Sequence, residues 1–553
     1  MNTQNIRFFL FAAIMLISML LYNAWQQEHV QPKHALAKTP KAEQVASVEH
    51  IPPTVGEKTT LEETPAVAEH ADRHIQVKTD VLNLTIDKVG GDIIQLILPA
   101  FAEDQKNYGQ GYILLDHSSR RYYIAQSGLA SEQGPDKRGI GRGKFETAQK
   151  AYQLHENQNE LKVDLKTHTA QGVEIIKRFS FQKGSYAINV EYLIHNKGKE
   201  PYKGNFYARL KRKDETKSSG GFLGIQTFTG AAIHTAETPY KKISFKDIQE
   251  KPIDQSVQGG WAAMVEHYFV SAWIPPKDET CTYQTHKSEE EIYSVGLVEP
   301  TIHVAPGEEK SISAKLYAGP EITEDLQKLA PGLELSVDYG ILWPICQPIF
   351  WLLKKIHHFT GNWGLAIILI TVLIKLLFYK LSASSYRSMG NMRKLQPRLE
   401  ALKERYGEDK QKFSQSVMEL YRKEKINPLG GCLPILVQIP VFIALYYVLL
   451  GSVELREAPF IGWITDLSDK DPYYVLPILM GASMLIQQKL NPAPADPVQA
   501  KVMMLMPVVF TVLFLNFPAG LVLYWLVNNV LSIIQQWFIT KRIESTAISH
   551  AAK

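Results

Sequence analysis

The sequence predicts a protein of mixed fold class, in which an α-helical membrane bundle is joined to a large all-β domain and a helical hairpin. Residues 75–335 are typical of short strands, because apolar and polar residues alternate there and glycine-containing turns separate the runs. After residue 340, long apolar stretches recur. Another apolar run, 8–22, stands near the N-terminus. These three observations divide the chain into a β-rich part and a membrane part.

Composition excludes several classes of function. The chain has 553 residues with a formal net charge of +4, so it is not a polybasic protein. We therefore predict that it does not read nucleic acid directly. Its three cysteines, Cys281, Cys346 and Cys432, are far apart and form no CxxC pair, which predicts neither a disulfide framework nor a zinc site. We expect no metal and no cofactor.

The N-terminal apolar run follows Arg7 and permits two interpretations, a cleaved signal peptide or a retained anchor. The nearest small-x-small site, Ala35-Leu36-Ala37, lies too far downstream for cleavage. We therefore predict a transmembrane signal anchor at 1–25 with a cytoplasmic N-terminus. Residues 26–74 are rich in Gln, Glu, Lys, Ala, Pro and His and predict a flexible linker.

The β-rich segment 75–335 is long enough for one large sandwich with its own core. Alternation is clearest in the runs 161–165 and 186–194. The glycine-rich stretch 139–143, Gly-Ile-Gly-Arg-Gly, resembles a phosphate loop only loosely, because no apolar strand leads into it and no helix follows. We interpret it as a mobile turn.

The apolar stretches after the β-rich segment predict six transmembrane helices in all, five of them in one bundle. Residues 336–360 have an aromatic apolar side and a basic end, which suits an interfacial amphipathic helix, although a buried connector helix is the alternative. Transmembrane helix 2 is predicted at 361–382 and helices 3–6 within 427–540. The middle stretches are short for a bilayer and carry prolines.

Charge bias orients the bundle. Between residues 380 and 425 there are twelve Lys or Arg and six acidic residues, which places this segment in the cytoplasm, whereas the acidic loop 452–472 suits the outer side. The basic start of the tail 541–553 returns to the cytoplasm. Residues 26–335 are thereby predicted to lie outside.

Residues 383–426 carry narrow apolar stripes at helical spacing on both sides of a turn at 406–409, which predicts two antiparallel helices. Two interpretations stay open at this point. The hairpin is either simply solvated, with its stripes facing each other, or a docking arm for incoming chains or ribosome-linked partners.

Lys375 is the most unusual residue, because it stands in the apolar run 365–378. Thr371, Lys375, Tyr379 and Ser382 form one polar stripe at helical spacing, and Gln438 sits inside the third span. The final span repeats the pattern with one polar face and three further residues beside it: Tyr524, Asn528, Ser532 and Gln535, then Trp525, Asn529 and Gln536. The stripes indicate either a hydrated recess containing Lys375, or interhelical hydrogen bonds with Lys375 snorkelling to the headgroups.

Several longer strings carry a family resemblance. They lie in the predicted membrane part and in the β-rich part: Asn427-Pro-Leu-Gly-Gly-Cys-Leu-Pro, Ala444-Leu-Tyr-Tyr, Gly451-Ser-Val-Glu-Leu-Arg, Phe517-Pro-Ala-Gly-Leu-Val-Leu-Tyr-Trp, Asp338-Tyr-Gly, Gly361-Asn-Trp-Gly, Ala272-Trp-Ile-Pro and Gln126-Ser-Gly-Leu. Together they resemble the YidC/Oxa/Alb family of membrane-protein insertases, in its Gram-negative form with a large periplasmic domain. The resemblance covers essentially the whole chain.

The resemblance implies a multi-pass protein of the bacterial inner membrane with a periplasmic β-supersandwich. Such proteins insert and help fold nascent membrane proteins, alone or with the Sec translocon and its accessory subunits, and meet the ribosome or signal-recognition-particle pathway in the cytoplasm. They use a groove open to cytoplasm and lipid. The family's groove cation falls at Lys375 and its partners at Thr371, Gln438, Tyr524 and Trp525; the polar face adds Asn528 and Ser532.

Two departures and two rival functions accompany this resemblance. Many bacterial members carry arginine at position 375 and tyrosine at position 525, and lysine lacks the planar fork of arginine. A transporter or channel would more typically show internal repeats and a polar path across both leaflets. A membrane enzyme is disfavoured because no HExxH or GxSxG motif is present, and a Lys375–Thr371 dyad would lack an orienting third group.

Overall fold

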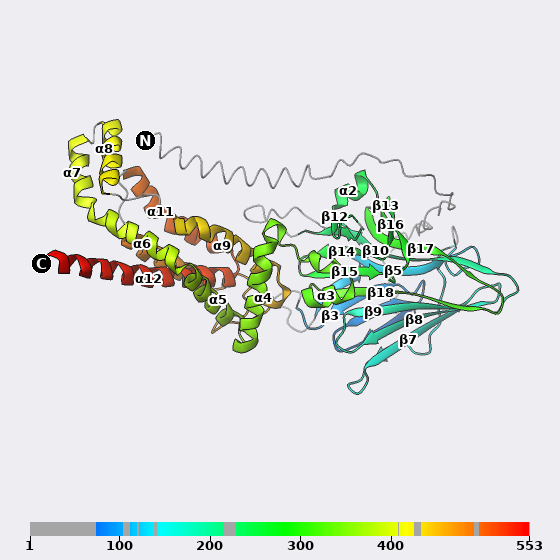
Figure 1. The fold of residues 1–553 in the computed structure, drawn as a ribbon. Coiled ribbons are helices and arrows are strands. Elements are labelled where there is room, and N and C mark those ends of the chain that lie inside the picture. Colours follow the sequence, from blue (N-terminus) through cyan, green and yellow to red (C-terminus); the bar gives the residue numbers. More distant parts are fainter. Residues whose placement is uncertain are drawn as a thin grey trace, which may run out of the picture. The chain divides into compact units, whose positions relative to one another are not determined.

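The computed structural model describes residues 73–102, 111–118, 121–137, 141–214, 228–235, 237–406, 409–424, 433–491 and 497–551. The described chain forms two compact units (Figure 1). One is β-rich and extends to residue 343, and it also includes the later segment 450–457; the other contains the C-terminal helices. The predicted anchor 1–25 and the linker up to residue 72 lie outside the described residues.

The β-rich unit contains a sheet of ten strands among the described residues, in the order β13-β16-β17-β10-β5-β4-β3-β2-β1-β6. All its neighbouring strands are antiparallel except β1 and β6, which are parallel. Its strands are β1 (His74–Lys78), β2 (Asn83–Asp87), β3 (Ile93–Leu98), β4 (Tyr112–His117), β5 (Tyr122–Ala130), β6 (Ala151–Gln153), β10 (Tyr202–Lys213), β13 (Asp254–Gln258), β16 (Thr280–Lys287) and β17 (Ile292–Val304).

A second sheet of eight described strands has the order β12-β11-β14-β15-β18-β9-β8-β7. Its strands are β7 (Glu160–His168), β8 (Val173–Gln182), β9 (Ala187–Asn196), β11 (Gly230–Ile233), β12 (Lys241–Ile243), β14 (Ala262–Glu266), β15 (Phe269–Ile274) and β18 (Glu309–Pro320). Two short helices accompany the sheets, α2 (Phe245–Glu250) and α3 (Thr323–Leu329).

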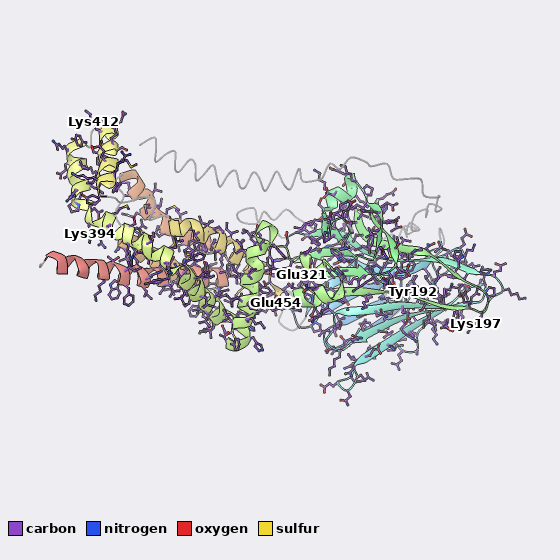
Figure 2. The ribbon with its side chains drawn as sticks, viewed as in Figure 1. Tyr192, Lys197, Glu321, Lys394, Lys412 and Glu454 are labelled. Carbon is purple, nitrogen blue, oxygen red and sulfur yellow. The ribbon has the colours of Figure 1, made fainter. Side chains whose placement is uncertain are left out.

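The two sheets enclose one large apolar core, which confirms the predicted sandwich. Strand β9 shows why, since every second residue from Ile188 to Ile194 is buried and the intervening ones are more exposed. This is the pattern of a strand with one face on a core. Large aromatic side chains from both sheets fill the interior, among them Tyr192, Phe206 and Trp273. In Figure 2 the labelled Tyr192 lies within the β-rich unit.

The sequence predicts that the glycine-rich turn 139–143 is mobile, and this prediction is wrong for its arginine, Arg142. Gly139 and Ile140 lie outside the described residues. The Arg142 guanidinium is only 13% exposed and forms ion pairs with the buried carboxylates of Asp92 and Asp136. It also donates to the carbonyls of Gly90 and Ser127 at 3.1 and 2.9 Å. The paired carboxylates raise the pKa of Arg142 against the effect of its burial, so the side chain stays charged. Arg142 therefore anchors the turn to the sandwich.

The second unit is helical. Its described helices are α4 (Trp343–Thr360), α5 (Trp363–Leu377), α6 (Tyr379–Lys394), α7 (Gln396–Tyr406), α8 (Lys410–Lys423), α9 (Leu433–Gly451), α10 (Val475–Leu490), α11 (Pro497–Phe514) and α12 (Ala519–Ala551). By length and apolar composition, one described helix, at Ala519–Lys541, could cross a membrane, or two if a bent pair is counted as one span. Three shorter apolar helices accompany it, at Val437–Gly451, Val475–Leu490 and Ala500–Phe514. The number of six spans stays a prediction.

The helical boundaries differ from the sequence prediction at the second span and the hairpin. The bent pair is α5 and α6, which meet at an angle of 69° around Phe378, so the predicted span 361–382 is not one straight helix. Helix α6 then occupies the start of the segment predicted as the hairpin. Helices α7 and α8 lie side by side in the described structure (Figure 1) and are joined by an ion pair of Arg398 with Glu424 at 2.6 Å.

Apolar side chains on the outside of the helical unit indicate contact with lipid. Helix α11 exposes seven large apolar side chains: Val502, Met504, Leu505, Met506, Val508, Val509 and Val512. Helix α5 exposes Leu369, Leu373 and Leu377 in the same way. An apolar surface of this extent is unusual on a soluble monomer and typical of an interaction surface or of a helix face in a bilayer.

Helix α4 presents two different faces. Cys346 and Leu353 are fully buried, and the Cys346 thiol lies 3.5 Å from the carbonyl oxygen of Ala444 on α9. Trp351 and Phe359 are 63% and 86% exposed. The helix thus combines features of both interpretations, because one face packs on the protein and the other is aromatic and free to enter a membrane interface.

Candidate functional site

Lys375 and the polar face of α12 meet in the described structure. Tyr524, Asn528 and Ser532 follow at intervals of four residues and therefore share one face of α12. The Lys375 ammonium donates a hydrogen bond to the Ser532 hydroxyl at 2.7 Å, across 157 residues of sequence. Ser532 in turn donates to the carbonyl of Asn528 at 2.7 Å. The two polar patterns seen in the sequence thereby become one site.

Gln438 of α9 extends this site along α12. Its amide nitrogen lies 2.5 Å from the side-chain oxygen of Asn528 and 3.3 Å from the hydroxyl of Tyr524. Residues from α5, α9 and α12 thus form a continuous polar network, which we call the Lys375 network: Lys375, Ser532, Asn528, Gln438 and Tyr524. Tyr524 and Ser532 are 1% and 3% exposed, whereas Lys375 is half-buried.

The charge of Lys375 is not neutralised by any carboxylate in the described part of the chain. Its ammonium group has three N–H donors, and one of them is used by Ser532. No ion pair of Lys375 occurs among the described residues. A half-buried cation with a single hydroxyl partner retains two donors for water or for an acceptor that enters the site.

Thr371 has a different role from that of the Lys375 network. Its hydroxyl donates to the carbonyl of Ile367 at 2.6 Å, within the same helix, and the residue is 1% exposed. The predicted continuous stripe from Thr371 to Ser382 is wrong, because the bend at Phe378 separates its two halves. Tyr379 is 49% exposed, whereas Ser382 of α6 is buried.

The bend brings in a residue that the sequence reasoning missed. Tyr386 of α6 lies close to Ser532, whose hydroxyl accepts from Lys375, and packs with Ala383 and Ile539. The spacing of Ser382, Ser385 and Tyr386 on one helical face was a usable signal. The sequence analysis assigns residues after 382 to the cytoplasmic hairpin, and for that reason it does not connect this polar face with Lys375.

Trp525 lies apart from the Lys375 network, among aromatic rings of α9 and α11. Its ring contacts Phe442 at 4.6 Å, Phe514 at 5.4 Å and Phe510 at 6.1 Å between ring centroids. The indole N–H is buried and has no hydrogen-bond partner among the described residues. Trp525 thus stands beside the polar site and belongs to an apolar aromatic cluster.

A second set of polar side chains on α12 joins this helix to α10. Asn529 donates to the hydroxyl of Ser483 at 3.1 Å, and Gln536 donates to the carbonyl of Leu490 at 3.2 Å and to the side chain of Asn491 at 3.1 Å. These bonds are those expected of polar residues that hold helices together in a membrane. On α12, the residues that bond α10 adjoin the Lys375 network but have different partners.

Comparison with known proteins identifies the family. Residues 74–352 match the family model described as YidC periplasmic domain, and residues 355–546 match the model described as 60Kd inner membrane protein. A relative from Pseudomonas fluorescens (strain SBW25), named membrane protein insertase YidC, is 51% identical over 559 residues, which cover 99% of this chain and 99% of the relative. The chain belongs to the YidC membrane protein insertase family.

Further YidC relatives are similar in sequence over most of the chain. The protein of the same name from Azotobacter vinelandii is 50% identical over 555 residues, covering 98% of this chain and 99% of that one. The solved structure of an active YidC insertase with its first transmembrane domain resolved matches 84% of this chain and 92% of its own, at 20% identity and a TM-score of 0.38. Because that TM-score is below 0.5, the assignment to the YidC family rests on the family models and the sequence relatives.

Proposed function

We propose that this chain, as a YidC insertase, inserts nascent membrane proteins by receiving their polar outer tail at the Lys375 network. A nascent segment that crosses a bilayer must carry a polar, often acidic, tail through an apolar layer about 30 Å thick. A charged residue at the centre of that layer costs about 2.5–3.5 kcal/mol on insertion scales. A cation inside the bundle would offset part of this cost for an acidic tail.

The single observation that carries the proposal is the state of Lys375. It is half-buried, bonded to one hydroxyl and not paired with a carboxylate in the described part of the chain. A lysine kept only for packing would be expected to have its donors filled, because unfilled donors in a dry interior are costly. The remaining N–H donors of Lys375 can bind water and then a client carboxylate as each enters the site. The site therefore acts as a hydrated recess.

The helix lengths support a thinned barrier around this recess. Helix α5 has 15 residues and α10 has 16, which correspond to about 22 and 24 Å at 1.5 Å per residue. Both are shorter than the apolar layer of an average bilayer, and short helices thin the bilayer locally. The distance over which the tail must travel without water is reduced accordingly. Release follows when the apolar segment enters lipid, and no nucleotide or cofactor is needed.

The topology that this function requires has six membrane spans and both termini in the cytoplasm, with residues 26–335 in the periplasm. The labelled Lys394 and Lys412 in Figure 2 belong to the basic segment that the positive-inside rule assigns to the cytoplasm. There α7 and α8 would serve as a docking arm for the ribosome or the signal-recognition-particle pathway. Cooperation with the Sec translocon belongs to the same proposal.

Site-specific photocrosslinking tests where the client passes. A photoreactive residue at position 375, 438 or 525 of the full chain is combined with a stalled nascent membrane protein. Crosslinks from 375 and 438 are expected as the tail passes, and from 525 as the apolar segment passes the aromatic cluster. A photoreactive residue at position 536, on the face of α12 that bonds α10, is the control and should stay silent. Silence at 375 and 438 would contradict the proposal.

A further inference from the structure

Segment 450–457, the start of the connection from α9 to α10, lies with the β-rich unit rather than with the helices that it joins. It contains the short helix η6 (Val453–Leu455), and the side chains of Val453 and Leu455 are 2% and 0% exposed. A loop between two helices would ordinarily run over the surface with its side chains in solvent. This segment is instead buried like a bound peptide.

Arg456 is the centre of the contact. Its guanidinium carbon lies over three aromatic rings of the β-rich unit, 5.1 Å from the centroid of Tyr112, 5.3 Å from Phe269 and 5.6 Å from Tyr268. The guanidinium also donates to the carbonyl of Ala102. The Arg456 side chain is only 14% exposed. Aromatic faces around a cation form a recognised type of cation-binding cage.

The cage walls are held in place from behind. Tyr112 stacks on Phe269 with a centroid distance of 4.2 Å, and its hydroxyl donates to Glu266 at 2.8 Å. Glu266 is itself paired with Arg121 and Arg212 at 3.3 and 2.8 Å. Two of the three faces, those of Tyr112 and Phe269, are therefore supported by a buried ion network and do not depend on Arg456 for their positions.

Further bonds join the two sides of this contact. The backbone N–H of Ala102 donates to the carboxylate of Glu457 at 2.7 Å, and a ring nitrogen of His267 lies 2.9 Å from the carbonyl oxygen of Leu450. Tyr268 and Glu457 both have positive φ angles, of 73° and 57°. Non-glycine residues adopt this conformation rarely, and such strain persists where the surrounding contacts over-determine it.

From these contacts we infer that the β-rich unit carries an arginine-binding cage, formed by Tyr112, Tyr268 and Phe269, whose ligand is the chain's own segment 450–457. The occupied cage restrains the connection between α9 and α10. Its opening frees segment 450–457. The cage is independent of the proposed function, since it concerns only the β-rich unit and the segment bound to it.

Amide hydrogen exchange of the full-length protein tests the cage. Arg456→Ala should accelerate exchange in segment 450–457 and at residues 100–102 at least about tenfold, because one charge-assisted hydrogen bond and the cation–π contacts are lost. Exchange in β8 and β9 should stay unchanged. Arg456→Lys keeps the charge without the planar fork and should give a smaller acceleration in the same two segments.

The control is Arg178→Ala, which removes another arginine of the same unit from its pair with Asp164. It should leave both segments at the exchange rate of the parent protein. Unchanged exchange in Arg456→Ala would overturn the inference. An equal acceleration throughout the β-rich unit would do so as well, since it would show a general structural role rather than a cage. If Arg456→Ala fails to accumulate, Arg456→Lys gives the same comparison.

Discussion

Lys375→Glu is expected to slow the insertion of clients with acidic outer tails by about tenfold or more. Two unit charges about 4 Å apart interact by about 4 kcal/mol at an effective dielectric constant of 20, and replacing lysine by glutamate turns attraction into repulsion. Water in the recess weakens this effect, and a remaining difference of about 1.4 kcal/mol already corresponds to tenfold in rate. Insertion is measured as protease protection of the client in vesicles containing the variant.

The specificity of this effect distinguishes tail capture from damage to the fold. Clients whose tails carry no acidic residue should insert at close to the parent rate in Lys375→Glu, and Lys375→Arg should be tolerated because the charge is kept. Lys380→Glu is the matched control, because Lys380 is an exposed lysine on α6, five residues further along. Normal insertion of acidic-tailed clients by Lys375→Glu, or an equal loss in Lys380→Glu, would show that the tail-capture step is wrong.

Arg142→Ala is expected to destabilise the β-rich unit by about 3–5 kcal/mol at neutral pH, because it leaves two buried carboxylates without their guanidinium. Asp92 and Asp136 have side chains that are 9% and 4% exposed, so solvent cannot replace Arg142. For a domain of this size the change corresponds to a fall of about 10 °C in the midpoint of thermal unfolding. Calorimetry of the full-length protein in detergent measures that midpoint.

The pH dependence of this loss has a definite sign. Burial raises the pKa of the Asp136 carboxyl, and the Arg142 guanidinium opposes this shift. Without Arg142 the pKa of Asp136 rises further above that of the unfolded chain, so the folded variant binds a proton more readily. Its deficit in the free energy of unfolding should therefore shrink as the pH falls from 7 towards 4. Arg178→Ala removes a half-exposed pair with Asp164 and should cost about 1 kcal/mol or less. Equal midpoints for the two variants would contradict the role assigned to Arg142.

The sequence predicts most local features of this protein and few of its long-range contacts. The alternation that predicts β9 depends on a strand having one buried face, which is a local property. The polar face of Tyr524, Asn528 and Ser532 follows from helical spacing in the same way. The contact of that face with Lys375 does not follow from local spacing. The register between α5 and α12 is set by packing between helices whose contacting residues are 157 positions apart in the sequence.

Three features illustrate what local patterns leave undetermined. The bend between α5 and α6 falls at residues 376–379, where there is neither proline nor glycine to indicate it. Arg142 stands in a glycine-rich turn that resembles a solvated loop, and Asp92 lies 50 residues away in sequence. In the sequence Arg456 is one charge in a loop, whereas its aromatic cage comes from β4, β15 and the turn before β15, almost 200 residues or more earlier in the chain.

The central claim is that the Lys375 network is hydrated, and thiol labelling tests it most directly. In a chain whose three cysteines are replaced by serine, Ser532→Cys is compared with Gln536→Cys. Both positions are 3% exposed, but Ser532 faces Lys375 whereas Gln536 faces α10. Gln536 lies one turn nearer the cytoplasmic end in the proposed topology, so depth alone would favour its reaction.

In inside-out vesicles, a charged, membrane-impermeant maleimide should label Ser532→Cys at least about tenfold faster than Gln536→Cys, since maleimides react with the thiolate and water must reach the thiol for it to ionise. Labelling of Ser532→Cys as slow as that of Gln536→Cys would show that the space around Lys375 is dry, and would contradict the account of how clients enter the bilayer.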